Sequence, residues 1–190
     1  MLFRWFYRFL LIALATGLLA VLLVVFAALV TLPSLPSLET LTDYRPKIPL
    51  RIYSADNFLI GEFGEERRDF VKIEEVPKSL KQAILAAEDD RFYQHYGVDY
   101  IGVLRAIYSN FKAGGAHQGA STITMQVARN FFLTKEKTLT RKFSEALLAF
   151  KIEHSLEKDQ ILELYINQIY LGQRSYGFSS AAQSYFGKQL

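Results

Sequence analysis

The feature that most constrains this chain is an uncharged segment near its N-terminus. From Phe9 to Leu32 there are 24 consecutive residues without Asp, Glu, Lys or Arg. A helix of this length, rising about 1.5 Å per residue, would span about 36 Å and cross a hydrocarbon core of roughly 30 Å. The run therefore predicts a transmembrane helix at residues 9–32, and it raises the overall hydrophobic content to 51%.

Charges flanking this run predict its orientation. Arg4 and Arg8 precede it, whereas the first charged residues after it are the acidic Glu39 and Asp43. The positive-inside rule then places residues 1–8 in the cytoplasm as a short tail, and the rest of the chain after the helix outside.

A cleaved signal peptide is the alternative interpretation of the same run. Its apolar core is usually about 7–15 residues long, which is clearly shorter than the run seen here. No small-x-small cleavage site follows the run before Pro33 either. Both observations favour an uncleaved signal anchor.

Composition excludes several kinds of site. The chain has 190 residues and no cysteine, so disulfides, thiolate metal sites and a cysteine nucleophile are ruled out within it. The net charge of +3 is mild and fits an anionic substrate or a membrane surface. Nucleic acid is a poor candidate partner at this charge and on this side of a membrane.

The remaining chain divides into a linker and one domain. Residues 33–50 predict an extended linker, and residues 51–63 predict two short strands around an Asp56-Asn57 turn. After Pro77 the pattern is helical almost to the end. We therefore expect a mainly α fold at residues 51–190, with a short β-hairpin before the helical core.

Three consecutive acidic residues, Glu88, Asp89 and Asp90, follow an apolar helical run. On a helix that starts near Pro77, Glu88 falls about 80° from Leu80, at the edge of the apolar stripe, and Asp89 points towards water. A carboxylate held against apolar surface is poorly solvated when charged and becomes a usable proton acceptor near neutrality. A solvated acidic helix end is the alternative.

A glycine-rich loop precedes a second helix, which opens near Ser121 and Thr122. Either hydroxyl can cap this helix, whose free N–H groups form a ready anion site, although an ordinary cap is the alternative. Ser121 has no evident triad partner, which argues against a serine hydrolase. Basic side chains then accumulate; they suit a diphosphate or a solvated helix face, and they are Arg129, Lys135, Lys137, Arg141 and Lys142.

The helix expected from about Thr138 to Leu156 is apolar on more than one side. Its main core stripe is predicted to be Leu139, Phe143, Leu147 and Phe150. Roughly opposite lies the Arg141–Glu145 pair, four residues apart, which either supports the helix or lines a groove that meets a charged head group. The histidines, His95, His117 and His154, show no metal-ligand spacing.

Five ordered motifs over residues 70–188 resemble the peptidoglycan glycosyltransferase domain of class A penicillin-binding proteins, glycosyltransferase family 51. The first three are Glu88-Asp89-x-x-Phe92-x-x-His95-x-Gly97, Gly119-x-Ser121-Thr122-Ile123-x-x-Gln126 and Arg141-Lys142-x-x-Glu145. The last two are Ile161-Leu162-Glu163-x-Tyr165-x-Asn167 and Tyr176-Gly177 through Tyr185-Phe186-Gly187-Lys188. The departures are small: Met125 stands where glutamine is common, and Ile166 where leucine is common.

The resemblance implies a lysozyme-like fold that polymerises lipid II into β-1,4-linked glycan and releases undecaprenyl diphosphate. Glu88 matches the general base, and Glu145 matches a second essential carboxylate near the donor diphosphate. Arg129, Lys137 and Arg141 resemble positions that neutralise the leaving group, beside Lys142 of the third motif. Residues that would bind substrate or support the cleft are Asp89, Phe92, His95, Ser121, Thr122 and Gln126.

The resemblance also implies partners and a location. No cofactor is expected to be required; some family members are helped by a divalent cation, Mg²⁺ or Mn²⁺, but no dedicated ligand set appears. The expected partners are lipid II, the growing glycan chain, the cytoplasmic (inner) membrane and other cell-wall synthesis proteins. The hairpin before Pro77 favours a bifunctional member of the 1A type. We therefore expect residues 51–190 to be a C-terminally shortened glycosyltransferase domain without the transpeptidase domain.

Two alternatives stay open at this point. A lysozyme-like glycan hydrolase or lytic transglycosylase would share the fold and a catalytic glutamate, although it needs neither a diphosphate-binding cluster nor a bilayer-embedded substrate. A non-catalytic, membrane-anchored module that binds lipid II would use the cationic run without turnover.

Overall fold

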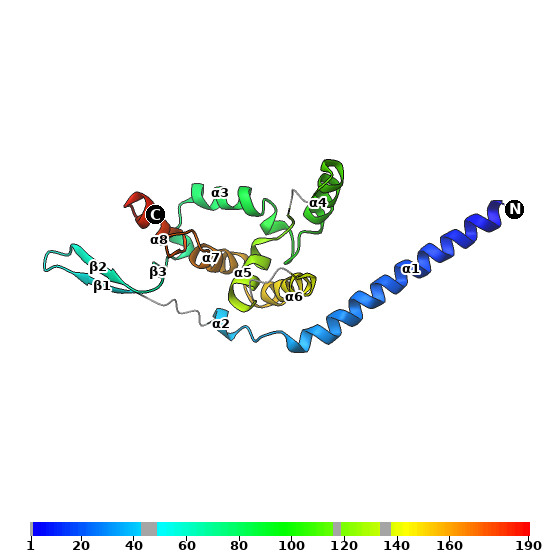
Figure 1. The fold of residues 1–190 in the computed structure, drawn as a ribbon, viewed down its shortest axis with the longest axis horizontal. Coiled ribbons are helices and arrows are strands. Elements are labelled where there is room, and N and C mark those ends of the chain that lie inside the picture. The colour runs from blue at the N-terminus through cyan, green and yellow to red at the C-terminus, as the bar shows by residue number, and fades with distance from the viewer. Residues whose placement is uncertain (1, 43–48, 116–118, 134–137) are drawn as a thin grey trace. The chain divides into compact units, whose positions relative to one another are not determined.

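The first helix stands apart from the rest of the chain in composition and in contacts. The computed structural model describes residues 2–42, 49–115, 119–133 and 138–190, which form two compact units, Met1–Pro36 and Ser37–Leu190 (Figure 1). In the first unit, α1 (Leu2–Thr31) is followed by the short 3-10 helix η1 (Leu32–Ser34). The segment Phe3–Ser34 contains an 18-residue window with a mean hydropathy of 3.0, and within the described residues it is the one helical segment long and apolar enough to cross a membrane.

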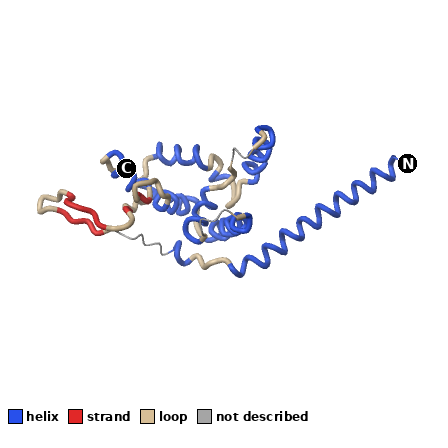
Figure 2. Tube along the Cα trace, in the orientation of Figure 1, coloured by secondary structure: helices blue, strands red, loops and turns tan. Residues whose placement is uncertain are grey.

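The second unit begins with a short helix and a hairpin. The helical turn α2 (Glu39–Thr42) interrupts the predicted extended linker and buries Leu41, while residues 43–48 lie outside the described residues. Strands β1 (Leu50–Tyr53) and β2 (Leu59–Phe63) pair antiparallel, as predicted (Figure 2). Asn57 supplies the positive φ, 64°, that their turn requires.

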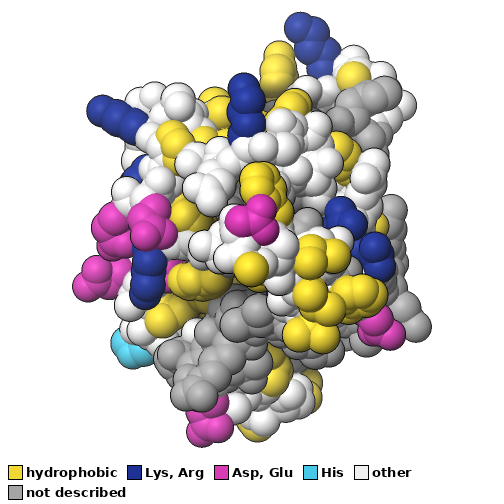
Figure 3. Space-filling model, turned by 90° about the vertical axis from the view of Figure 1, so that its left-hand side faces the viewer, with side chains coloured by type: hydrophobic (Ala, Val, Ile, Leu, Met, Phe, Trp, Pro, Cys, Tyr) yellow, Lys and Arg dark blue, Asp and Glu magenta, His cyan; other side chains and the backbone are white. Residues whose placement is uncertain are grey.

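Most apolar side chains of this hairpin are exposed. Ile60 is 69% exposed and Phe63 60% exposed. A space-filling view shows a face of the molecule on which hydrophobic side chains lie among charged ones (Figure 3). The guanidinium of Arg51, in the hairpin, donates a hydrogen bond to Asp69 at 3.3 Å and so connects the hairpin to the segment that follows Arg68.

The helical core is built around α5 (Ile123–Phe132), which packs against α6 (Leu139–Ser155) and α7 (Lys158–Gln168) (Figure 1). The remaining helices are α3 (Lys78–Glu88), α4 (Tyr100–Ala113) and α8 (Phe178–Phe186), with the short 3-10 helices η2 (Ile73–Glu75) and η3 (Phe92–Gln94). The centre of the core consists of fully buried side chains: Ile123, Val127, Leu148, Ile152, Ile161, Leu162 and Ile166.

The predicted core stripe of α6 is wrong. Leu139 is 90% exposed and Phe150 43% exposed, whereas Leu148 and Ile152 on the opposite side are fully buried. Both sides of this helix carry apolar residues, and periodicity alone does not say which side α5 and α7 will cover. The cap positions agree with the prediction, since Thr138 accepts from the Arg141 N–H and Leu156 follows the last turn.

Two further features were not predicted. Strands β3 (Arg67–Arg68) and β4 (Ser175–Tyr176) pair in parallel across more than a hundred residues of sequence. Each has two residues, too few for alternation to be visible. In addition, α7 ends at Gln168, and Gly172 has a φ of 92° in the turn that follows.

Candidate active site

The end of α3 carries an exposed carboxylate. Glu88 is the last residue of this helix, and its Oε2 accepts a hydrogen bond from Gln126 Nε2 at 2.8 Å. Glu88 is exposed, so it is not withdrawn from water as the helical projection predicted. The prediction placed Glu88 and Asp89 on one continuous helix. The backbone instead leaves the helix at Asp89, with φ −162° and ψ 79°. This turn sends Glu88 outwards and Asp89 inwards.

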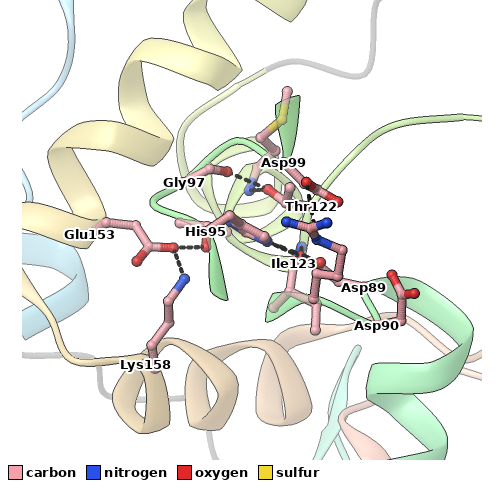
Figure 4. A network of polar contacts seen from close by, with 12 residues as sticks. Asp89, Asp90, His95, Gly97, Asp99, Thr122, Ile123, Glu153 and Lys158 are labelled. Atoms are coloured by element: carbon pink, nitrogen blue, oxygen red, sulfur yellow. Dashed lines mark hydrogen bonds and ion pairs between the residues drawn. The ribbon is translucent and has the colours of Figure 1, made fainter. Parts of the chain in front are cut away.

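Asp89 was predicted to point towards water, but it is buried and contacts the start of α5 (Figure 4). Its Oδ2 accepts from the Ile123 N–H at 3.0 Å, and both carboxylate oxygens lie 3.0 Å from His95 Nε2. The predicted anion site at the start of α5 is therefore occupied by a carboxylate of the chain itself. Asp89 and His95 therefore connect the segment after α3 to the start of α5.

Thr122, and not Ser121, caps α5. Its Oγ1 accepts from the Met125 N–H at 3.2 Å and donates to the Gly97 carbonyl at 2.6 Å. This second bond joins the cap to the loop after η3. The hydroxyl of Ser121 instead accepts a hydrogen bond from Lys142 Nζ, which links the start of α5 to α6.

A second carboxylate, Glu145, lies fully buried on α6 with 1% exposure. It forms ion pairs with Arg141, as predicted from the spacing, and with Lys142 at 2.8 Å. Burial, followed by the charges of Arg129 and Arg141, lowers the pKa of the Lys142 ammonium group. Two cations thus pair with one buried carboxylate, a third, Arg129, acts on Lys142, and the excess positive charge suits an anionic ligand.

Arg129 connects this cluster to a cavity of about 690 Å³. The cavity brings residues together from β3, α5, α7 and β4, among them Arg68, Asn130, Gln168, Tyr170 and Tyr176. These lining residues were not predicted, because no pattern in the sequence indicates that β3 lies next to α7. Figure 1 shows their elements in the helical unit.

Tyr165 is buried on α7 and lies within electrostatic reach of Glu88 and Arg129. Burial and then the charge of Glu88 raise the pKa of its hydroxyl, while Arg129 opposes that shift.

The other predicted site residues fall in two groups. Phe92 is 1% exposed and supports the site from the interior. Lys137 lies outside the described residues, as do Lys135 and His117. Among the described residues no three His, Asp or Glu side chains form a group that could hold a metal ion.

The chain resembles known proteins over most of its length. Residues 56–190 match the family model described as Transglycosylase. Penicillin-binding protein 1A of Neisseria flavescens is 62% identical over 152 residues, which are 80% of this chain and 19% of that protein. The protein of the same name from Neisseria cinerea is 64% identical over the same shares, and that of Haemophilus influenzae is 60% identical over 75% of this chain and 17% of its own length.

A crystal structure of the Haemophilus influenzae penicillin-binding protein 1A covers 77% of this chain and 12% of that chain, at 27% identity and a TM-score of 0.27. The present chain spans about a fifth of the length of the curated relatives it matches. The family model covers far more than half of the chain, and the chain belongs to the transglycosylase family.

Proposed function

We propose that this chain carries a peptidoglycan glycosyltransferase activity that polymerises lipid II into β-1,4-linked glycan strands, as part of a bifunctional enzyme. The observation that carries the proposal is a set of two unlike carboxylates that both connect to the start of α5, Glu88 through Gln126 and Glu145 through Lys142 and Ser121. Glu88 is exposed and held by a neutral amide, whereas Glu145 is buried and held by two cations. Membership of the transglycosylase family supports the same reading.

In the proposed reaction Glu88 is the general base. It takes the proton from the 4-hydroxyl of the acceptor GlcNAc, whose oxygen attacks C1 of the MurNAc at the growing end. The bond between C1 and the diphosphate oxygen breaks with inversion, and undecaprenyl diphosphate departs with its electron pair. General-base catalysis of this kind contributes about 10²- to 10⁴-fold in rate, and substrate binding would remove water from the exposed carboxylate and strengthen it as a base.

The leaving diphosphate is the proposed ligand of the cationic cluster, defined here as Arg129, Arg141 and Lys142. The buried charge of Glu145 fixes two of these cations from behind, so that they need no reorganisation when charge develops. Lys137 is proposed to join them.

We infer that α1 is a signal anchor in the cytoplasmic membrane with its N-terminus in the cytoplasm. Its length and mean hydropathy support a single span, and Arg4 and Arg8 before it support the orientation. The helical unit would then work on the outer face, where lipid II and the growing glycan are proposed partners.

The test incubates the full chain, in detergent or vesicles, with lipid II and separately with finished glycan strands. We expect polymer and undecaprenyl diphosphate from lipid II, and a rate lower by about 10²- to 10⁴-fold for Glu88→Gln. Asp90→Asn is the matched control, because Asp90 is exposed and pairs with Arg105. Cleavage of finished glycan would instead support a lysozyme-like hydrolase, and lipid II binding without polymer would support a binding module.

A further inference from the structure

A buried polar cluster on the far side of α5 lies outside the motifs assigned above (Figure 4). Its centre is Glu153, on α6, whose side chain is 3% exposed. The hydroxyl of Thr124, itself fully buried, donates to Glu153 Oε1 at 2.6 Å. Burial of a carboxylate is costly unless it is paired, so this residue needs a compensating partner.

Lys158 is that partner. Its Nζ donates to the same Oε1 atom at 2.7 Å and lies 4.4 Å from the centre of the Phe92 ring. Lys158 is the first residue of α7, where a positive charge opposes the helix dipole. Two individually unfavourable placements, a buried acid and a cation at a helix start, are therefore combined in one contact.

The contact joins the two segments that carry Glu88 and Gln126. On one side, Thr124 lies two residues before Gln126, about 200° away around α5. The bond to Glu153 therefore holds the side of α5 opposite to the Gln126 amide. On the other side, Phe92 follows Glu88 by four residues and packs edge-on against His95, with ring centres 6.3 Å apart.

We propose that Glu153 and Lys158 form a positioning pair that sets the rotation of α5 and thereby holds Gln126 in place against the Glu88 carboxylate. The inference rests on the proposed function of Glu88. Neither residue touches the reacting atoms; both act through Thr124 and Phe92. Because misplacement by about 1 Å can cost as much as 100-fold in rate, a loosened α5 should affect turnover more than substrate affinity.

The test replaces Thr124, which removes one hydrogen bond and leaves the ion pair in place. Thr124→Val keeps the shape and loses the donor, and Thr124→Ser restores the donor. We expect kcat for lipid II polymerisation to fall about tenfold in Thr124→Val with KM within about twofold, and Thr124→Ser to regain the wild-type kcat.

Ser180→Ala is the matched stability control. The Ser180 hydroxyl is buried on α8 and donates to the Arg67 carbonyl at 2.9 Å, so this variant also loses one buried hydroxyl bond. It should lower Tm by an amount similar to that of Thr124→Val while its kcat stays at the wild-type value. Equal kcat in the two variants would overturn the positioning role.

A double-mutant cycle tests the route of the effect. If Thr124 acts through the Gln126–Glu88 contact, Thr124→Val should change kcat by less than about twofold when Gln126 is already alanine. A full tenfold loss in that background would refute the inference.

A readout without turnover separates this inference from the proposed function. In protein labelled with ¹⁵N-glutamine, Thr124→Val should shift the side-chain amide signals of Gln126, and Thr124→Ser and Ser180→Ala should leave them in place. Unmoved signals in Thr124→Val would refute the positioning role even if polymerisation is observed. Shifted signals without polymer from the wild type would support the pair and reject the proposed activity.

Discussion

Glu88 and Glu145 are the same residue type in opposite surroundings. Glu88 ends a helix, is exposed, and accepts one hydrogen bond from a neutral amide. Glu145 lies inside a helix, is 1% exposed, and faces two cations. Ion pairs with cations favour the charged form of a carboxylate, whereas a hydrogen bond from a neutral amide brings no positive charge to it. We propose that the two surroundings suit two different roles, proton transfer for Glu88 and the placement of positive charge for Glu145.

The strongest way to break this comparison is to remove the buried carboxylate. Glu145→Ala removes the buried carboxylate that pairs with Arg141 and Lys142, and breaking a buried ion pair typically costs about 3–5 kcal/mol. Lys142 is 40% exposed and water can compensate it in part, so we expect the lower end, about 3 kcal/mol. Urea denaturation measures the change. Glu88→Gln should cost less than about 0.5 kcal/mol in the same experiment, and an equal cost for both variants would contradict the contrast.

The neighbour of Glu88 sharpens the comparison, because Asp89 shares its segment but resembles Glu145 in burial. Asp89→Ala leaves the Ile123 N–H and His95 without an acceptor and should destabilise the fold by about 2 kcal/mol. Asp89→Asn keeps one amide oxygen as an acceptor and should lose less. Thermal unfolding of both variants checks this order. If Asp89→Ala were no less stable than Asp90→Asn, the anchoring role of Asp89 would have to be abandoned.

The smallest effect concerns the charge that Glu145 organises. Inorganic pyrophosphate at ten times its Kd should stabilise the folded chain by about 1.4 kcal/mol, seen as a rise in Tm. Arg129→Ala and Arg141→Ala should abolish the rise, and added salt should weaken it. Glu88→Gln should leave it unchanged or enhance it, since this variant removes a negative charge. A rise that persists in both arginine variants would show that the cationic cluster does not bind the diphosphate.

Local sequence signals predicted much of this fold. The apolar run, the Asp-Asn turn and the helix starting at Thr138 all depend on neighbours in the chain, and the structure agrees with each. The Arg141–Glu145 pair also follows from helical spacing alone. The family could be predicted from ordered motifs, and residues 56–190 match it.

The errors arose where tertiary contacts decide. Glu88 and Asp89 exchanged their predicted environments because α3 ends between them, and a helical projection has no meaning beyond its last turn. The prediction for the core side of α6 was wrong because both sides of the helix are apolar, and packing against α5 and α7 decides which side is buried. The proposed role of the Glu153–Lys158 pair could not be predicted from the sequence. It depends on contacts with Thr124 and Phe92, which are distant in the sequence.

The central claim is that the exposed carboxylate of Glu88 accepts the proton. The most direct test is the dependence of kcat/KM on pH for lipid II polymerisation by the wild type and by Glu88→Gln. The wild-type rate should fall about tenfold per pH unit on the acidic side, as a single essential base is protonated. The residual rate of Glu88→Gln should be independent of pH over that range. An acidic limb that persists in Glu88→Gln would show that another group is the base.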